Sequence, residues 1–135
     1  MTKFAAAYAA VVVVFAALDL LWLGVIAKPF YQSELGHLLA ARPNFVVAAI
    51  FYLVFGVGLM IFAVAPNVAD HQWRATLTAA ALFGVFAYAT YDLSNLATLR
   101  DWPIRLSILD IVWGGLISAT AALAGKFALD HLSAA

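Results

Sequence analysis

The chain has 135 residues, of which 67% are hydrophobic and only 10% are charged. Soluble domains average about 25% charged residues, so this composition, with a mean hydropathy of +1.01, predicts an integral membrane protein. The seven basic residues balance the seven acidic ones without forming a stripe, and cysteine is absent, which excludes nucleic-acid binding, disulfides and thiolate chemistry.

The first apolar run covers residues 4–27 and is interrupted only by Asp19. At about 24 residues it is longer than the 7–15 residues of a signal-peptide core, and the sequence around Lys28 is a poor cleavage site. We therefore predict a retained transmembrane helix. Its only internal charge then lies within the bilayer.

The connection 28–43 is the only long loop that the sequence predicts. Tyr31, Leu35, Leu38 and Leu39 follow helical spacing within it, which predicts a short amphipathic helix at the membrane interface. Two roles remain open for this segment. It is either a connector that lies on the surface or a lid over a polar site.

The runs 45–65, 75–99 and 104–127 complete a set of four, and the second of the four ends at Pro66. Each run meets the roughly 20 residues needed to cross a bilayer, and none shows the period-two alternation of a barrel strand. The remaining loops are short, which favours antiparallel neighbours. The predicted fold is an all-α membrane protein, a single domain over 1–135, with four transmembrane helices in an up-down antiparallel bundle.

Basic residues at the helix ends suggest an orientation. In a four-span bundle the first and third loops share one side, which carries Lys28, Arg42, Arg100 and Arg105. The opposite side carries Lys3, Arg74 and Lys126. The positive-inside rule favours a cytoplasmic location for the first side. Two tryptophans at the predicted interfaces are interpreted as aromatic-belt anchors: Trp73 and Trp102.

Three aspartates lie inside the apolar runs: Asp19, Asp92 and Asp110. A carboxylate at a helix centre costs roughly 2.5–3.5 kcal/mol on insertion scales, so such residues are usually functional and need partners. Counted from the side of the long loop they lie about eight, seven and six residues deep, or roughly 9–12 Å at 1.5 Å per residue. Tyr52 reaches a similar depth. We expect these four side chains to face one shared cavity.

Residues three or four positions from each acid share its helix face. The face of Asp19 continues through Trp22, and that of Asp110 continues through Trp113. The resulting cavity candidates are Asp19, Trp22, Tyr52, Tyr88, Tyr91, Asp92, Asn95, Asp110 and Trp113. Three arginines are candidates for receiving an anionic headgroup at the mouth: Arg42, Arg100 and Arg105.

Segments 18–24 and 109–115 repeat the pattern Asp-x-x-Trp, which either marks an ancient duplication or arose by coincidence. A set of glycines predicts close helix approach: Gly56, Gly58, Gly84, Gly114 and Gly115. The histidines are widely separated and lack metal-ligand spacing, so we predict no histidine metal site, and we expect no cofactor. Ser94 has no histidine on a helix to activate it.

Three classes of function remain open. The first is binding or transport of a small molecule, lipid or cation, since acids facing a bundle interior suit such ligands. A single bundle of four helices leaves little room for a translocation path, so a homodimer is expected. The second is a lipid-modifying enzyme or its partner, in which Asp92 and Asp110 supply acid–base chemistry or oxygen ligands for a divalent cation. The third is a structural subunit whose polar residues only join helices.

The run from Tyr91 to Pro103 reads Tyr-Asp-Leu-Ser-Asn-Leu-Ala-Thr-Leu-Arg-Asp-Trp-Pro. Together with segments 18–24 and 110–114, it resembles the recurrent patches of a bacterial membrane-protein family, domain of unknown function 2177 (DUF2177). The resemblance covers nearly the whole chain. It implies a four-span protein of the bacterial inner membrane, surrounded by membrane lipids, and no established activity. It also favours a lipid-related role.

Overall fold

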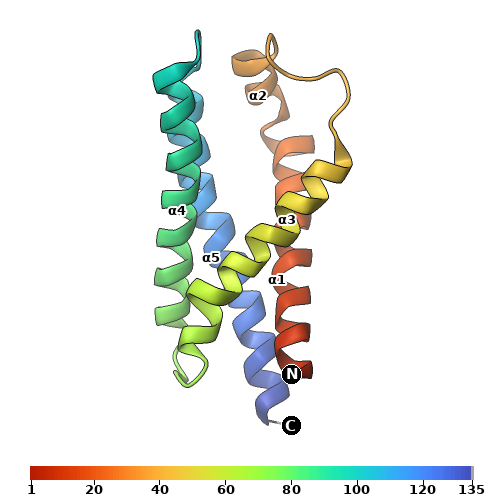
Figure 1. Ribbon diagram of the computed structural model, residues 1–135, viewed down its shortest axis with the longest axis vertical. Helices are drawn as coiled ribbons and strands as arrows, with labels where there is room; N and C mark the ends of the chain where they lie inside the picture. Colours follow the sequence, from red (N-terminus) through yellow and green to blue (C-terminus); the bar gives the residue numbers. More distant parts are fainter. Residues whose placement is uncertain (135) are drawn as a thin grey trace.

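The computed structural model describes residues 1–134, which are helical apart from short connections. Four helical segments are long and apolar enough to cross a membrane: Thr2–Ile26, Phe45–Asn67, Trp73–Thr98 and Ile104–Ala134. They alternate in direction, so that the N- and C-terminal ends lie at the same end of the bundle (Figure 1). The predicted four-helix up-down fold is confirmed.

The first two spans each end in an irregular helical turn. In chain order the elements are α1 (Thr2–Leu21), the π-helical η1 (Trp22–Ile26), α2 (Lys28–Leu35), α3 (Phe45–Leu59), the π-helical η2 (Met60–Val64), the 3₁₀-helical η3 (Ala65–Asn67), α4 (Trp73–Thr98) and α5 (Ile104–Ala134). The Asn44 side chain caps α3 by accepting the N–H groups of Val46 and Val47 at 3.1 and 3.2 Å. This cap satisfies backbone donors that the first helical turn leaves free.

The last helix, α5, is the centre of the bundle. Half of its most apolar stretch (50%) is buried, against 17–22% in the other three spans. It packs along both α1 and α4, whereas α3 crosses the bundle obliquely (Figure 1). The largely exposed apolar surface of α3 suits contact with lipid, while α1, α4 and α5 form the scaffold.

Close contact between α4 and α5 depends on glycine. A Cβ added at Gly84 would strike the carbonyl oxygen of Gly114, and one added at Gly114 would strike the ring of Tyr88. Added Cβ atoms at three further glycines would lie 2.6, 2.7 and 2.9 Å from side chains of neighbouring helices: Gly56, Gly58 and Gly115. The predicted close approach is therefore confirmed, and it seats Tyr88 against the backbone of α5.

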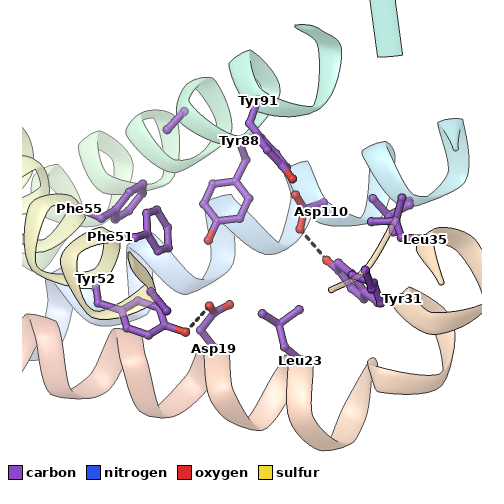
Figure 2. A pocket seen from close by; sticks show the side chains of 14 residues that line it. Asp19, Leu23, Tyr31, Leu35, Phe51, Tyr52, Phe55, Tyr88, Tyr91 and Asp110 are labelled. Atoms are coloured by element: carbon purple, nitrogen blue, oxygen red, sulfur yellow. Dashed lines mark hydrogen bonds between the residues drawn. The ribbon is translucent and has the colours of Figure 1, made fainter. Parts of the chain in front are cut away.

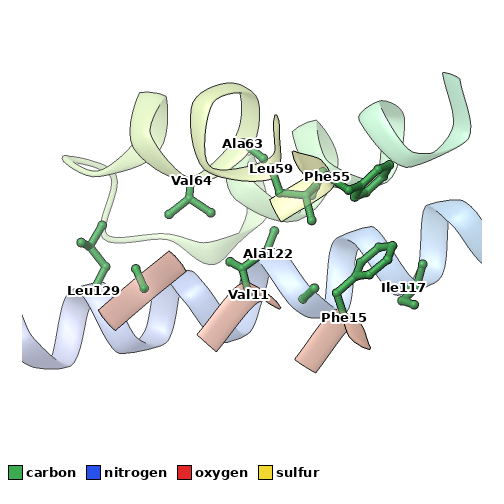
Figure 3. Close-up of a cluster of buried hydrophobic side chains, with 12 residues drawn as sticks. Val11, Phe15, Phe55, Leu59, Ala63, Val64, Ile117, Ala122 and Leu129 are labelled. Atoms are coloured by element: carbon green, nitrogen blue, oxygen red, sulfur yellow. The ribbon is translucent and has the colours of Figure 1, made fainter. Parts of the chain in front are cut away.

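Two apolar clusters lie at different levels of the bundle. The larger one, toward the chain ends, joins α1, α3, η2, α4 and α5 through buried side chains such as Val11, Phe15, Leu59 and Ile117 (Figure 3). The smaller one, at the other end, packs Leu35 against residues that follow α4 and open α5. The polar residues predicted to converge lie between these two clusters.

The ends of the helices differ in places from the prediction. The short helix expected in 28–43 is present as α2, but it ends at Leu35, and the following Leu38 and Leu39 are exposed. Trp102 is not an exposed belt anchor; only 9% of it is accessible, because it packs under α2 and donates its Nε1–H to Ser107 Oγ at 3.1 Å. Trp73, which is 47% exposed, keeps a position compatible with the interface.

Candidate functional site

A cavity of about 570 Å³ lies between the two apolar clusters. Its ionisable lining consists of two carboxyl groups and four phenols: Asp19, Asp110, Tyr31, Tyr52, Tyr88 and Tyr91 (Figure 2). The rest of the wall is apolar: Leu23, Leu35, Leu39, Ala48, Phe51, Phe55, Ala87 and Leu106. All four spans and α2 contribute to it. A volume in this range and a mostly apolar wall are typical of small-molecule sites.

Asp19 on α1 is 6% exposed and has a hydrogen-bond donor on each oxygen. The Tyr52 hydroxyl on α3 donates to Oδ2 at 2.9 Å, and the Trp113 Nε1–H on α5 donates to Oδ1 at 3.2 Å. Charge-assisted bonds of this kind are what a buried carboxylate requires. One acid therefore connects three of the four spans.

Asp110 on α5 is held in a different way. The Tyr31 hydroxyl on α2 donates to its Oδ1 at 2.5 Å, and the same hydroxyl accepts the Trp22 Nε1–H at 3.4 Å. Burial and the adjacent negative charge of Asp110 raise the pKa of Tyr31 above its usual value, so this phenol stays a neutral donor at physiological pH. The bond fastens α2 to α5 across the cavity (Figure 2).

The two Asp-x-x-Trp patterns meet beside the cavity, through their tryptophans. Trp22 and Trp113 stack with ring centroids 4.3 Å apart and planes 7° from parallel. Each tryptophan serves the aspartate of the other helix: Trp113 reaches Asp19 directly, and Trp22 reaches Asp110 through Tyr31. The stacked pair therefore links the hydrogen bonds of Asp19 to those of Asp110 between α1 and α5. This gives the repeated pattern a structural role, whatever its origin.

Asp92 on α4 occupies a position that the depth argument did not predict. It is 0% exposed and is not among the residues that line the cavity. Within residues 1–134 neither of its oxygens has a hydrogen-bond partner. Asp110, on the closely packed helix α5, is near enough to interact electrostatically with it. Asp92 therefore sits next to the cavity rather than in its wall.

The other predicted residues divide between wall and periphery. Tyr88 and Tyr91 line the cavity, and the Tyr88 hydroxyl points into it (Figure 2). Asn95 is half-buried and lies outside the wall. Trp22 and Trp113 lie outside the wall and support it by donating hydrogen bonds to two of its residues, Tyr31 and Asp19 respectively.

None of the three predicted mouth arginines lines the cavity. Arg105 is directed outward: its guanidinium is 4.0 Å from the Glu34 carboxylate and 5.9 Å from the ring centre of Phe30, and 79% of its side chain is exposed. Arg42 and Arg100 are exposed in the connecting loops. The described part of the cavity wall thus contains acids and phenols but no basic group.

Sequence reasoning missed some contributors. Tyr31 lies in the segment for which the sequence leaves a connector and a lid open, and it is not among the predicted cavity residues. Phe51 and Phe55 lie on a helix without charges, where nothing in the sequence separates a wall residue from a lipid contact. At the far end, Lys126, which the sequence counts among the basic residues of that side, is 1% exposed and pairs with Asp130 at 2.7 Å.

Four apolar spans and a bundle built around its last helix define an integral membrane protein of four helices. Residues 4–127 match the family model DUF2177, described as a predicted membrane protein, so the chain belongs to that family. The resemblance found in the sequence is confirmed. No curated protein and no solved structure gives a significant match. In the described residues no group of three or more histidine, aspartate or glutamate side chains is arranged to hold a metal ion.

Proposed function

We propose that this protein binds a lipophilic cation, a molecule with an apolar body and a positively charged head, in the cavity between its helices. The observation that carries the proposal is the charge of the wall. Two carboxyl groups and four phenols line an otherwise apolar space, and the arginines nearby face outward. An apolar wall favours a ligand with a hydrophobic body. The ionisable groups described in this wall are carboxyl groups and phenols, with no basic group among them, and they favour a positively charged head.

The two acids suit this role in complementary ways. Asp19 has both oxygens supported by donors, so its charge is stabilised without a cation beside it. Asp110 accepts a single hydrogen bond in the described chain, from Tyr31 at Oδ1, so its charge is less fully satisfied than that of Asp19. Phenol rings around both acids add cation–π attraction of roughly 0.5–2 kcal/mol per well-placed ring. A cation in the cavity is then attracted from several sides.

A structural role for the acids is the second candidate, and a specific observation favours it. The bonds of Asp19 join α1 to α3 and α5, and those of Asp110 join α5 to α2. Polar side chains hold membrane helices together by up to about 1–2 kcal/mol each. In that case neutralising the acids lowers thermal stability and alters no binding.

Two ions of the same shape and opposite charge separate these candidates. Tetraphenylphosphonium and tetraphenylborate are equally bulky, so a difference in their binding reports charge selection rather than hydrophobicity. We expect the protein in nanodiscs to bind the phosphonium and not the borate above the level of empty nanodiscs. Asp19→Asn and Asp110→Asn should each weaken phosphonium binding at least about tenfold, the effect of 1.4 kcal/mol.

The matched control is Asp101→Asn. Asp101 is an exposed carboxylate in the loop between α4 and α5, and its φ of 58° is a conformation that asparagine tolerates well. This variant removes one negative charge at the same end of the bundle without touching the cavity. Equal binding of both ions, or undiminished binding in both cavity variants, would refute the proposal.

Location and assembly follow as parts of the same proposal. We infer that the protein resides in the bacterial inner membrane, as the family resemblance implies. Transport beyond binding would need a second chain, and we propose a homodimer. This is supported by the apolar cluster around Phe15, Leu59 and Ile117, each 0–1% exposed, which closes the bundle between the cavity and the chain ends.

A further inference from the structure

Asp92 is the most unusual side chain in the bundle. It lies inside the span Trp73–Thr98 and is completely buried, and both its carboxyl oxygens lack a hydrogen-bond partner in the described chain. Asp19 is also buried inside a span, but each of its oxygens has a hydrogen-bond donor. Burying an ionised carboxylate without a donor or counter-ion is so unfavourable that the group takes up a proton instead.

The ionisable groups that face Asp92 come from three elements. Asp110 approaches from α5, Tyr31 from α2, and Tyr91 stands beside it on α4. None of them is a cation. The Tyr31 hydroxyl is already engaged, because it donates to Asp110. Among these groups, the carboxyl group of Asp110 interacts most strongly with Asp92.

Two carboxylates that face each other are both acceptors, so they repel unless a proton lies between them. With one proton the contact becomes a hydrogen bond, and the pair carries a single negative charge. The Tyr31 hydroxyl bond stabilises that charge on Asp110. The proton consequently belongs on Asp92, which has no other means of satisfying its oxygens.

We propose that Asp92 and Asp110 share one proton, and that this proton leaves when a cation occupies the cavity. The second half rests on the proposed function. A cation beside Asp110 competes with the Asp92 O–H for the same charge and disfavours a proton nearby. The O–H bond of Asp92 then breaks, its electron pair stays on the carboxylate, and the proton passes to bulk water. One positive charge enters as another leaves, so the charge of the site is constant.

The proton on Asp92 is measurable without any ligand. Infrared spectra of the protein at neutral pH should contain the C=O band of a buried protonated carboxylic acid. This band should persist in the control Asp101→Asn and disappear in Asp92→Asn. Because asparagine resembles the protonated acid in shape and charge, this variant should fold. Asp92→Leu is a second variant, whose side chain needs no hydrogen-bond partner when buried. A wild-type spectrum without the band, or a band that survives in both Asp92 variants, overturns the shared proton.

The coupling is tested with tetraphenylphosphonium in weakly buffered nanodiscs that contain a pH-sensitive dye. The wild type should release one proton for each bound phosphonium, and its apparent affinity should fall as the pH is lowered, by up to tenfold per pH unit. Asp92→Asn should bind the probe without releasing a proton and with an affinity that does not change with pH.

The outcomes of the two experiments are distinguishable. Binding without proton release in the wild type contradicts the coupling and leaves the proposed function intact. Absence of binding contradicts both the proposed function and the coupling, while the infrared band still decides whether Asp92 holds a proton.

Discussion

Replacing Tyr31 by phenylalanine tests how α2 is held over the cavity. The substitution removes one oxygen atom and with it two hydrogen bonds, one donated to Asp110 at 2.5 Å and one accepted from Trp22 at 3.4 Å. A bond to a charged group contributes about 1.5–3 kcal/mol and a neutral one about 0.5–1.5 kcal/mol. The 3.4 Å bond is long, so we expect a total loss of roughly 2–3 kcal/mol.

The assay combines thermal unfolding in nanodiscs with hydrogen exchange of residues 28–35. Tyr31→Phe should lower the unfolding temperature and accelerate exchange in α2, because within residues 1–134 the side chains of α2 make no other hydrogen bond to the spans. Tyr8→Phe is the matched control. It removes a phenol bond of 2.9 Å to a neutral acceptor, the Leu53 carbonyl oxygen, away from the cavity. Equal effects in the two variants, or unchanged exchange in α2, would refute the reasoning.

Three further predictions concern packing, pH and surface charge. Gly114→Ala forces a methyl group against the Tyr88 ring and should lower the free energy of unfolding by about 1–3 kcal/mol. Gly24→Ala, where an added Cβ meets no described atom within 4 Å, should be neutral or mildly stabilising. A larger loss in Gly24→Ala than in Gly114→Ala would contradict the α4–α5 contact. The raised pKa of Tyr31 stabilises the folded state fully below the unfolded pKa of about 10, and this contribution is lost as the pH rises above that value, by up to about 1.36 kcal/mol per pH unit. The free energy of unfolding should therefore fall less steeply above pH 10 in Tyr31→Phe than in the wild type. Parallel curves for the two proteins would count against a buried phenol. Arg105→Gln, which changes an exposed side chain outside the cavity wall, should leave phosphonium binding unchanged, and a large loss would show that the head group binds at the mouth.

The spans, and the depth at which their polar residues are expected, can be predicted from the sequence because both follow from the thickness of the bilayer. Apolar runs of sufficient length mark the helices, and the rise per residue puts Asp19, Tyr52 and Asp110 at one depth. The structure brings these three to one cavity. Glycine positions also carried real information, because a residue without a side chain on an apolar helix usually marks a close neighbour.

Depth alone does not fix the rotation of a helix about its axis. The residue count gives Asp92 nearly the same depth as Asp19 and Asp110, yet it is fully buried and absent from the cavity wall, where α4 packs closely on α5 through Gly84 and Gly114. Tyr31 depends on a contact with Asp110, 79 residues later in the chain, which periodicity within 28–43 does not reveal. Trp102 was misplaced for the same reason: a tryptophan beside a helix end resembles a belt anchor until the segment packed over it is known.

The most direct test of the central claim, that the buried acids of separate helices form one cation site, is a structure with tetraphenylarsonium bound. Arsenic scatters X-rays anomalously, so its position is observed independently of the surrounding atoms. We predict an anomalous peak inside the cavity between the Asp19 and Asp110 carboxyl groups, enclosed by the tyrosine rings. A peak on the lipid-facing surface of α3, or beside the loop arginines, would contradict the claim.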